Sequence, residues 1–68
     1  MKWHTEPLTI CDVVLFQIDL DDGDIDTHLG YLGDEDDTMW DSQGDDIGWQ
    51  GKDVSRWVPL KEILDNLK

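Results

Sequence analysis

Residues 12–18 read DVVLFQI, a run of β-branched and aromatic side chains that predicts a β-strand. Val14, Phe16 and Ile18 would share one face of this strand, while Leu15 would lie on the other. Because both faces carry apolar side chains, we expect this strand to be a central strand of a sheet.

The rest of the chain alternates between Asp- and Gly-rich turns and short apolar runs. Asp forms turns through hydrogen bonds of its short side chain, and Gly adopts the positive φ angles that many turns require. We therefore expect turns at 20–24 (LDDGD), 33–37 (GDEDD) and 42–46 (SQGDD), a loop at 51–53, and strands at 25–32, 38–41, 47–50 and 54–58. In the strand at 25–32, Ile25, Thr27, Leu29 and Tyr31 alternate with Asp26, His28 and Gly30, which predicts a half-buried strand with His28 on its polar surface.

The C-terminal part of the chain changes to helical spacing. Pro59 has no N–H to donate to a strand ladder, so it is expected to end the last strand. Leu60, Ile63, Leu64 and Leu67 are spaced i, i+3, i+4 and i+7, which predicts one apolar face of a helix over 60–68, with Lys68 at the negative end of its dipole. We predict an α+β fold in a single domain, residues 1–68: a small antiparallel β-sheet of three to five strands with a short C-terminal helix packed on it. The expected core consists of Val14, Phe16, Ile18, Leu29, Trp57, Ile63 and Leu64.

The charge of the chain is strongly negative and unevenly distributed. There are 17 acidic and 5 basic residues, for a formal net charge of −12, and no Lys or Arg occurs between Trp3 and Gly51. Nucleic acids and anionic membranes are poor ligands for such a chain, because both are bound through Lys and Arg. A chain of 68 residues also has little volume for a deep catalytic pocket, so we do not expect an enzyme.

Motifs for metal binding or nucleophilic catalysis are weak. An EF-hand loop with Gly23 or Gly44 at its sixth position would have Ile18 or Met39 at its first, and neither side chain can ligate calcium. Cys11 is the only cysteine, so no internal disulfide can form, and neither histidine lies at zinc-site spacing from it. We therefore expect no metal and no cofactor. The sequence shows no signal peptide and no long apolar run, which predicts a cytoplasmic protein.

The acidic residues have two interpretations, which the sequence leaves open. Asp accounts for 14 of the 17 acids, and Asp favours turns and adds solubility without any specific partner. Alternatively, short side chains on tight turns hold their charges in fixed positions, and such an array can imitate the phosphates of DNA. In that case the partner-binding residues are Asp19, Asp21, Asp22, Asp24, Asp26, Asp34, Glu35, Asp36, Asp37, Asp41, Asp45 and Asp46. Trp40 and Trp49 lie near them and are further candidates, because Trp is favoured at binding hot spots.

Short motifs along the chain resemble a known family. They are Trp3 with Glu6-Pro7, the strand Val13-Val14-Leu15-Phe16, Trp40-Asp41, and Ser55-Arg56-Trp57-Val58-Pro59-Leu60. These motifs are similar to those of the five-five-one domain-of-unknown-function family of phages and prophages, whose members open with W-x-x-x-x-x-L-P, continue through a V-L-V strand and close on H-W-M-P-L-P. The chain departs from this pattern where Glu6 precedes Pro7, where Arg56 replaces His, and where Lys61 replaces the final Pro. The family has no established activity, so the resemblance implies only a phage accessory protein in a bacterial cytoplasm.

These observations lead to one expected function and one alternative. We expect a phage-type inhibitor that binds a basic, nucleic-acid-binding host protein of defence or transcription and occludes its DNA or RNA site. The alternative is a small adaptor that binds its partner through an exposed Trp or the apolar face of the helix at 60–68, with the acidity serving only solubility. High salt would release the first kind of partner and would leave the second bound.

Overall fold

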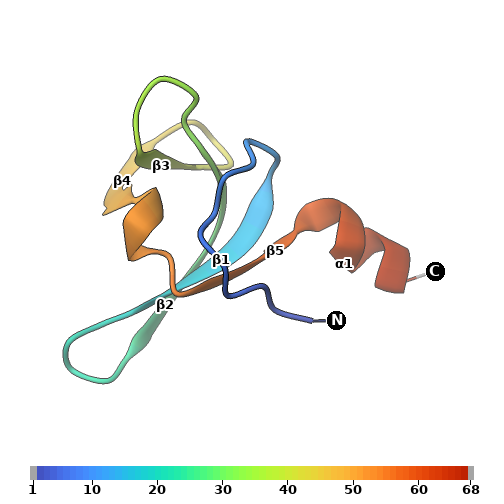
Figure 1. Cartoon of the computed structure of the whole chain (residues 1–68), viewed down its shortest axis with the longest axis horizontal. Coiled ribbons are helices and arrows are strands. Elements are labelled where there is room, and N and C mark those ends of the chain that lie inside the picture. Colours follow the sequence, from blue (N-terminus) through green and yellow to red (C-terminus); the bar gives the residue numbers. More distant parts are fainter. Residues whose placement is uncertain (1, 68) are drawn as a thin grey trace.

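The computed structural model describes residues 2–67, which form one antiparallel sheet followed by a helix (Figure 1). The elements are β1 (Val14–Asp19), β2 (Ile25–Leu32), β3 (Thr38–Asp41), β4 (Asp46–Gln50), the 3₁₀ turn η1 (Gly51–Asp53), β5 (Arg56–Pro59) and α1 (Leu60–Asn66). The strand order is β4-β3-β2-β1-β5, so the first four strands form a meander and β5 returns to the free side of β1. The expected α+β fold, an antiparallel sheet with a short C-terminal helix, is confirmed, as is the central position of β1.

The core lies on one face of the sheet and is centred on β1. Phe16 pairs with His28 of β2 and with Trp57 of β5, and directly paired residues of antiparallel strands project to the same side. Val14 and Ile18 are each two positions from Phe16 and therefore lie on the same side of the sheet, and all three are fully buried. The buried apolar residues are Leu8, Val14, Phe16, Ile18, Met39, Trp57 and Val58. The predicted core is therefore confirmed for Val14, Phe16, Ile18 and Trp57.

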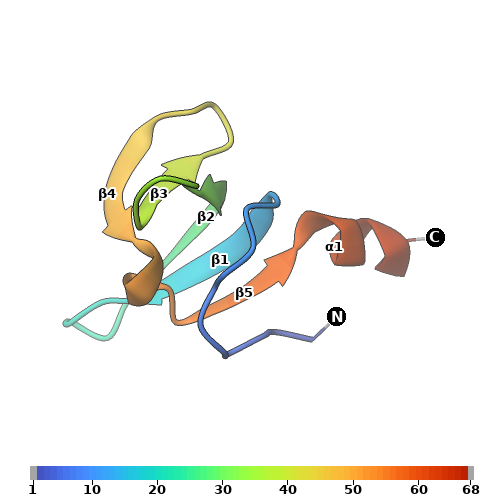
Figure 2. The ribbon, with the colours of Figure 1, turned by 45° about the horizontal axis from the view of Figure 1, so that its top comes forward.

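Three residues that were predicted to be in the core lie outside it. Leu29 is 38% exposed because it pairs with Leu15, which alternates with Phe16 onto the opposite face of the sheet. Leu64 is 52% exposed and Ile63 is only half-buried. Indeed, no residue of α1 is buried. The helix continues directly from β5 and extends past the end of the sheet (Figures 1 and 2), so its expected packing on the sheet is only partial.

The side of β2 that faces the core carries the polar and small residues Asp26, His28 and Gly30. The alternation along this strand had predicted that these residues face solvent. His28 packs against Phe16, with 5.6 Å between the ring centres, so its predicted place on the polar surface is wrong. Its Nε2 atom is buried without a hydrogen bond within residues 2–67 and lies 3.6 Å from Oδ2 of Asp26. Gly30 approaches β3 so closely that a methyl group there would overlap the carbonyl oxygen of Trp40. Pairing with the large residues of β1 therefore decides which face of β2 turns inward.

An irregularity in β4 interrupts the regular pairing with β3. Thr38 pairs with Gln50 and Trp40 pairs with Asp46, so β4 has two more residues than β3 over this interval. Gly48 lies in the resulting bulge with φ at +82°, a conformation that favours glycine, and its N–H donates to Oδ1 of Asp46 at 2.8 Å. The sheet curves from β5 round to β4 (Figure 2), and η1 carries the chain back across to β5.

The N-terminal segment lies along the edge of β5 that β1 leaves unpaired. His4 and Trp57 exchange two backbone hydrogen bonds, with N–O distances of 2.8 and 3.0 Å. Nε1 of the Trp57 indole donates to the carbonyl oxygen of Glu6 at 2.9 Å. At the other end of the chain, α1 ends at Asn66, and Lys68, which was predicted to face the helix dipole, lies outside the described residues.

Candidate partner-binding surfaces

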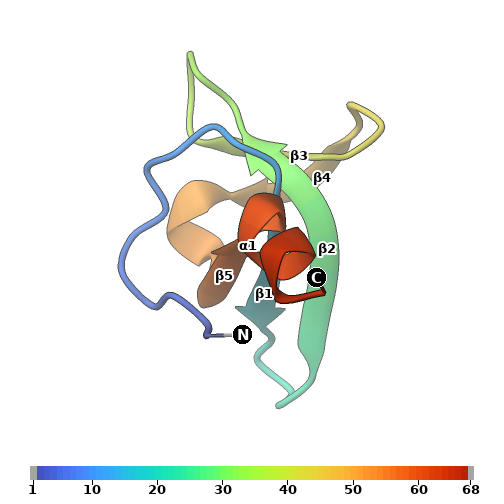
Figure 3. The ribbon, with the colours of Figure 1, turned by 90° about the vertical axis from the view of Figure 1, so that its right-hand side faces the viewer.

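The predicted partner-binding carboxylates lie at two opposite ends of the molecule. The turn at 20–24 joins β1 to β2 at one end, and the loops at 33–37 and 42–45 flank β3 at the other (Figures 1 and 3). The seven carboxylates at the second end, which we call the acidic loop end, are Asp34, Glu35, Asp36, Asp37, Asp41, Asp45 and Asp46. The first end carries Asp19, Asp21, Asp22, Asp24 and Asp26. The predicted residues therefore do not form one continuous face.

Backbone hydrogen bonds fix four carboxylates of the acidic loop end in place. Oδ1 of Asp41 accepts the N–H groups of Gln43 and Asp45 at 2.8 and 2.9 Å, and Gly44 adopts a φ of +88° in the same turn. The N–H of Thr38 donates to Asp36, that of Lys52 to Asp37 and that of Gly48 to Asp46, at 3.1, 3.2 and 2.8 Å. These bonds support the interpretation that Asp serves the turns, and they also hold the four charges in defined positions.

The other three carboxylates of the acidic loop end are free. Asp34, Glu35 and Asp45 are exposed, and their side chains form no hydrogen bond within residues 2–67. Within the same residues, none of the seven carboxylates forms an ion pair, since the ion pairs lie elsewhere in the chain. The negative charges of the acidic loop end therefore act together on an approaching ion.

The carboxylates at the β1–β2 end are more engaged within the protein. Asp19 accepts hydrogen bonds from Nη2 of Arg56 at both of its oxygens, each at 3.0 Å. Oδ1 of Asp22 accepts the N–H of Asp24 at 3.0 Å and stabilises the turn. Because a cation offsets part of the charge at this end, it is the weaker candidate for binding a basic partner.

The two tryptophans that were proposed as contact residues are both half-buried and lie in different environments. Trp49 of β4 packs against the core cluster, which accounts for its presence in this strand. Trp40 of β3 pairs with Tyr31 of β2, on the face of the sheet opposite Phe16. The recess there has a volume of about 320 Å³ and is lined by Cys11, Tyr31, Leu32, Gly33, Asp34 and Trp40.

A second surface, beside α1, is exposed and mostly apolar, with one ion pair between Lys61 and Asp12 at 3.7 Å. A cleft of about 410 Å³ separates the helix from the start of β1 and is lined by Asp12, Val13, Leu60, Lys61 and Leu64. Leu67, which directly follows the end of α1, is 77% exposed. The sequence predicted this apolar stripe but assigned two of its residues, Ile63 and Leu64, to the core, because helical spacing identifies an apolar face and not what covers it.

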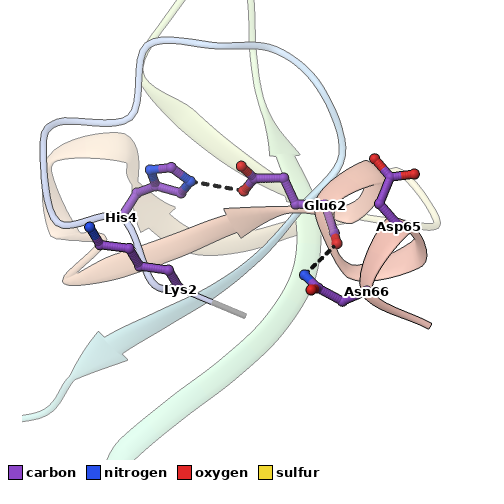
Figure 4. Close-up of a pocket in the computed structure, with 5 residues that line it drawn as sticks. All are labelled: Lys2, His4, Glu62, Asp65 and Asn66. Atoms are coloured by element: carbon purple, nitrogen blue, oxygen red, sulfur yellow. Dashed lines mark hydrogen bonds and ion pairs between the residues drawn. The ribbon is translucent and has the colours of Figure 1, made fainter. Parts of the chain in front are cut away.

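A charged cluster joins the N-terminal segment to α1 (Figure 4). Nε2 of His4 lies 2.8 Å from Oε2 of Glu62, Nδ1 lies 3.3 Å from Oε1 of Glu6, and the ring stacks on Trp57 with 4.7 Å between the ring centres. The hydrogen bond to Glu62 raises the pKa of His4 above its ordinary value of 6.5, which favours the charged imidazolium. The pKa of Glu6 is lowered, chiefly by the hydrogen bond from its own backbone N–H. The cluster ties the start of the chain to the helix.

His4 and Glu62 of this cluster also line an open cleft of about 430 Å³, together with Lys2, Asp65 and Asn66 (Figure 4). Sequence reasoning missed it because His4 and Glu62 are 58 positions apart, and no short motif links them. Within residues 2–67, no three side chains among His, Cys, Asp and Glu are grouped so that they could hold a metal ion. In the same part of the chain, no helix is long and apolar enough to cross a membrane.

Comparison of the chain with protein-family models, with curated proteins and with solved structures finds no match in any of the three. The resemblance to the phage family therefore stays a prediction.

Proposed function

We propose that this protein binds a basic, nucleic-acid-binding protein and covers the site at which that protein holds DNA or RNA. The observation that carries the proposal is the acidic loop end, where seven carboxylates have no ion-pair partner among residues 2–67. Uncompensated charge of one sign accelerates the encounter with a surface of the opposite sign and makes the complex sensitive to salt.

The fixed positions of four of these charges support the proposal. A short side chain that is already held by a backbone N–H loses little conformational freedom when a partner binds, so less of the interaction energy is lost to ordering. Duplex DNA carries one phosphate charge about every 1.7 Å of its axis, and carboxylates held in fixed positions can take the place of phosphates in a phosphate-binding groove. The resemblance to the phage family adds, by analogy, the expectation of a host protein of defence or transcription as the partner.

Capture from a bacterial lysate tests the proposal. The immobilised protein is washed with stepped salt, and parallel samples are eluted with duplex DNA. We expect a nucleic-acid-binding protein that both treatments release, because electrostatic screening shortens from about 8 Å at physiological ionic strength to about 3 Å at about 1 M. A set of bound proteins that all withstand high salt and ignore DNA would refute the proposal.

Two matched double variants locate the contact surface. Glu35→Gln with Asp45→Asn removes two free charges from the acidic loop end, and Asp21→Asn with Asp24→Asn removes two exposed charges from the β1–β2 end. We expect the first variant to release its partner at lower salt than the wild type, and the second to behave like the wild type. Equal effects would mean that only net charge matters and that the acidic loop end is not the contact surface.

The exposed cleft beside α1 favours a second candidate function, an adaptor that binds an apolar partner segment. Leu64 of α1 and Leu67, which directly follows the helix, are exposed large apolar residues, and exposed apolar surface marks interaction sites when it is extensive. Capture through this surface would survive high salt and would be lost in a Leu64→Gln/Leu67→Gln variant. If that variant retains every salt-resistant partner, the adaptor function is excluded.

A further inference from the structure

The recess between β2 and β3 combines two aromatic side chains with a free carboxylate. Tyr31 and Trp40 are directly paired across the two strands, and both are only half-buried. Gly33 also lines the recess, and a methyl group at this position would lie 2.9 Å from Nε1 of the Trp40 indole. A larger residue would therefore narrow the space. Asp34 is the charged residue of the lining, and its carboxylate is exposed and unbonded within residues 2–67.

The chemistry of this lining selects a planar cation. The faces of Tyr and Trp rings carry partial negative charge and attract a cation that lies over them. A guanidinium can stack on such a ring and also donate a forked pair of hydrogen bonds to a carboxylate, whereas a lysine ammonium is a point charge without that geometry. As formed by residues 2–67, the lining contains no Lys or Arg, and the other carboxylates of the acidic loop end add to the negative potential around it.

We propose that this recess binds one arginine side chain of the basic partner, with the guanidinium stacked on the Tyr31–Trp40 pair and hydrogen-bonded to Asp34. This inference rests on the proposed function and names the partner residue that anchors the complex. Surfaces that bind nucleic acids are rich in arginine, which reaches both phosphates and guanine. A basic partner of the kind proposed therefore presents suitable side chains.

Titration with N-acetyl-arginine methylamide tests the recess without the partner. The tryptophan indole N–H signals are followed by NMR, with sodium chloride at matched ionic strength as the control. We expect a saturable shift of the Trp40 signal, with the Trp49 and Trp57 signals unmoved. The affinity should be about two- to thirtyfold higher than that of the citrulline analogue, which has a similar shape without the charge. An equal response to the two compounds would overturn the proposal.

Asp34→Asn provides the matched variant. Because Asp34 is exposed and unbonded, the variant should keep the wild-type NMR spectrum outside the recess. Its preference for arginine over citrulline should be reduced but not abolished, because the two rings remain and only the carboxylate charge is lost. The Asp21→Asn/Asp24→Asn variant, altered at the other end of the molecule, should keep that preference. Retention of the full preference in Asp34→Asn would overturn the proposed contact.

The recess and the proposed function can fail separately. If the arginine compound binds as expected and duplex DNA releases no captured protein, the recess stands and the proposed function fails. If DNA and salt release a nucleic-acid-binding protein but the arginine compound produces no saturable shift, the recess proposal is wrong and the acidic loop end remains the contact surface.

Discussion

Asp41 and Asp45 belong to the same turn and carry the same charge, but only the Asp41 side chain takes part in the hydrogen bonding of the turn. Oδ1 of Asp41 accepts the N–H groups of Gln43 and Asp45, whereas the Asp45 carboxylate is unbonded within residues 2–67. Replacing either Asp with alanine changes the net charge from −12 to −11, so the overall repulsion changes equally. The difference in stability between Asp41→Ala and Asp45→Ala therefore measures the contribution of the turn.

The expected cost of Asp41→Ala follows from the two N–H groups that lose their acceptor. Losing an Asp that accepts backbone N–H groups in the comparable position before a helix costs about 0.5–2 kcal/mol, and in this exposed turn water replaces part of the lost bonding. We expect the free energy of unfolding to fall by about 1–2 kcal/mol, or roughly 5–15 °C in melting temperature for so small a domain. Asp45→Ala should change it by no more than about 0.5 kcal/mol.

Urea denaturation followed by tryptophan fluorescence measures both variants against the wild type. Asp41→Asn is a useful third variant, because it removes the charge while its amide oxygen can still accept the two N–H groups. Its stability should therefore lie between those of the wild type and Asp41→Ala. If Asp45→Ala is as destabilising as Asp41→Ala, the division of the acidic loop end into bonded and free carboxylates is wrong. The Glu35→Gln/Asp45→Asn variant could then no longer be assumed to leave the stability of the fold unchanged in the binding experiments.

The N-terminal segment, β2 and the core each allow a further test. The pKa of His4 is raised, chiefly by its hydrogen bond to Glu62, so protonated His4 stabilises the folded state. This contribution to the free energy of unfolding is complete below the ordinary pKa of 6.5 and is lost as the pH rises through the raised pKa. Melting temperatures from about pH 5 to 9 should show this loss in the wild type and not in His4→Gln. Gly30→Ala should cost about 1–3 kcal/mol or prevent folding, because the methyl group would overlap the carbonyl oxygen of Trp40, and an unchanged urea midpoint would contradict this. Phe16→Ala should cost about 3–5 kcal/mol and unfold much of the protein, whereas Phe16→Leu should still show the near-ultraviolet circular dichroism of a packed core.

The fold was predictable where neighbouring residues decide it and was not where pairing decides it. The run at 12–18 and the Asp- and Gly-rich turns are local signals, and β1 and the succession of short strands and turns follow from them. The strand order was not predicted, because it depends on which strands pair. Alternation along β2 shows which residues share a face, but the pairing of Phe16 with His28 determines which face turns inward. For this reason the sequence placed Leu29 in the core and His28 on the surface, the reverse of the structure.

The candidate site likewise has features that the sequence predicts and features that only the fold reveals. Composition alone identified the acidic turns, but which carboxylates are held by the backbone depends on turn geometry that the sequence does not encode by a simple pattern. Trp40 and Trp49 have similar polar neighbours along the chain, yet the bulge in β4 and the register of β3 direct them to different faces. The contact of His4 with Glu62 joins the two ends of the chain, so it becomes visible only after the fold is known.

The bulge at Gly48 also bears on whether molecules of this protein can add to one another strand by strand. Fibril growth needs an open edge with evenly spaced N–H and C=O groups, and the outer edge of β4 is broken by the bulge and carries the charge of Asp46. The opposite edge, on β5, is occupied by the backbone of His4. We therefore expect the folded chain to resist amyloid-type polymerisation. Detachment of the N-terminal segment would expose the outer edge of β5, at which polymerisation could begin.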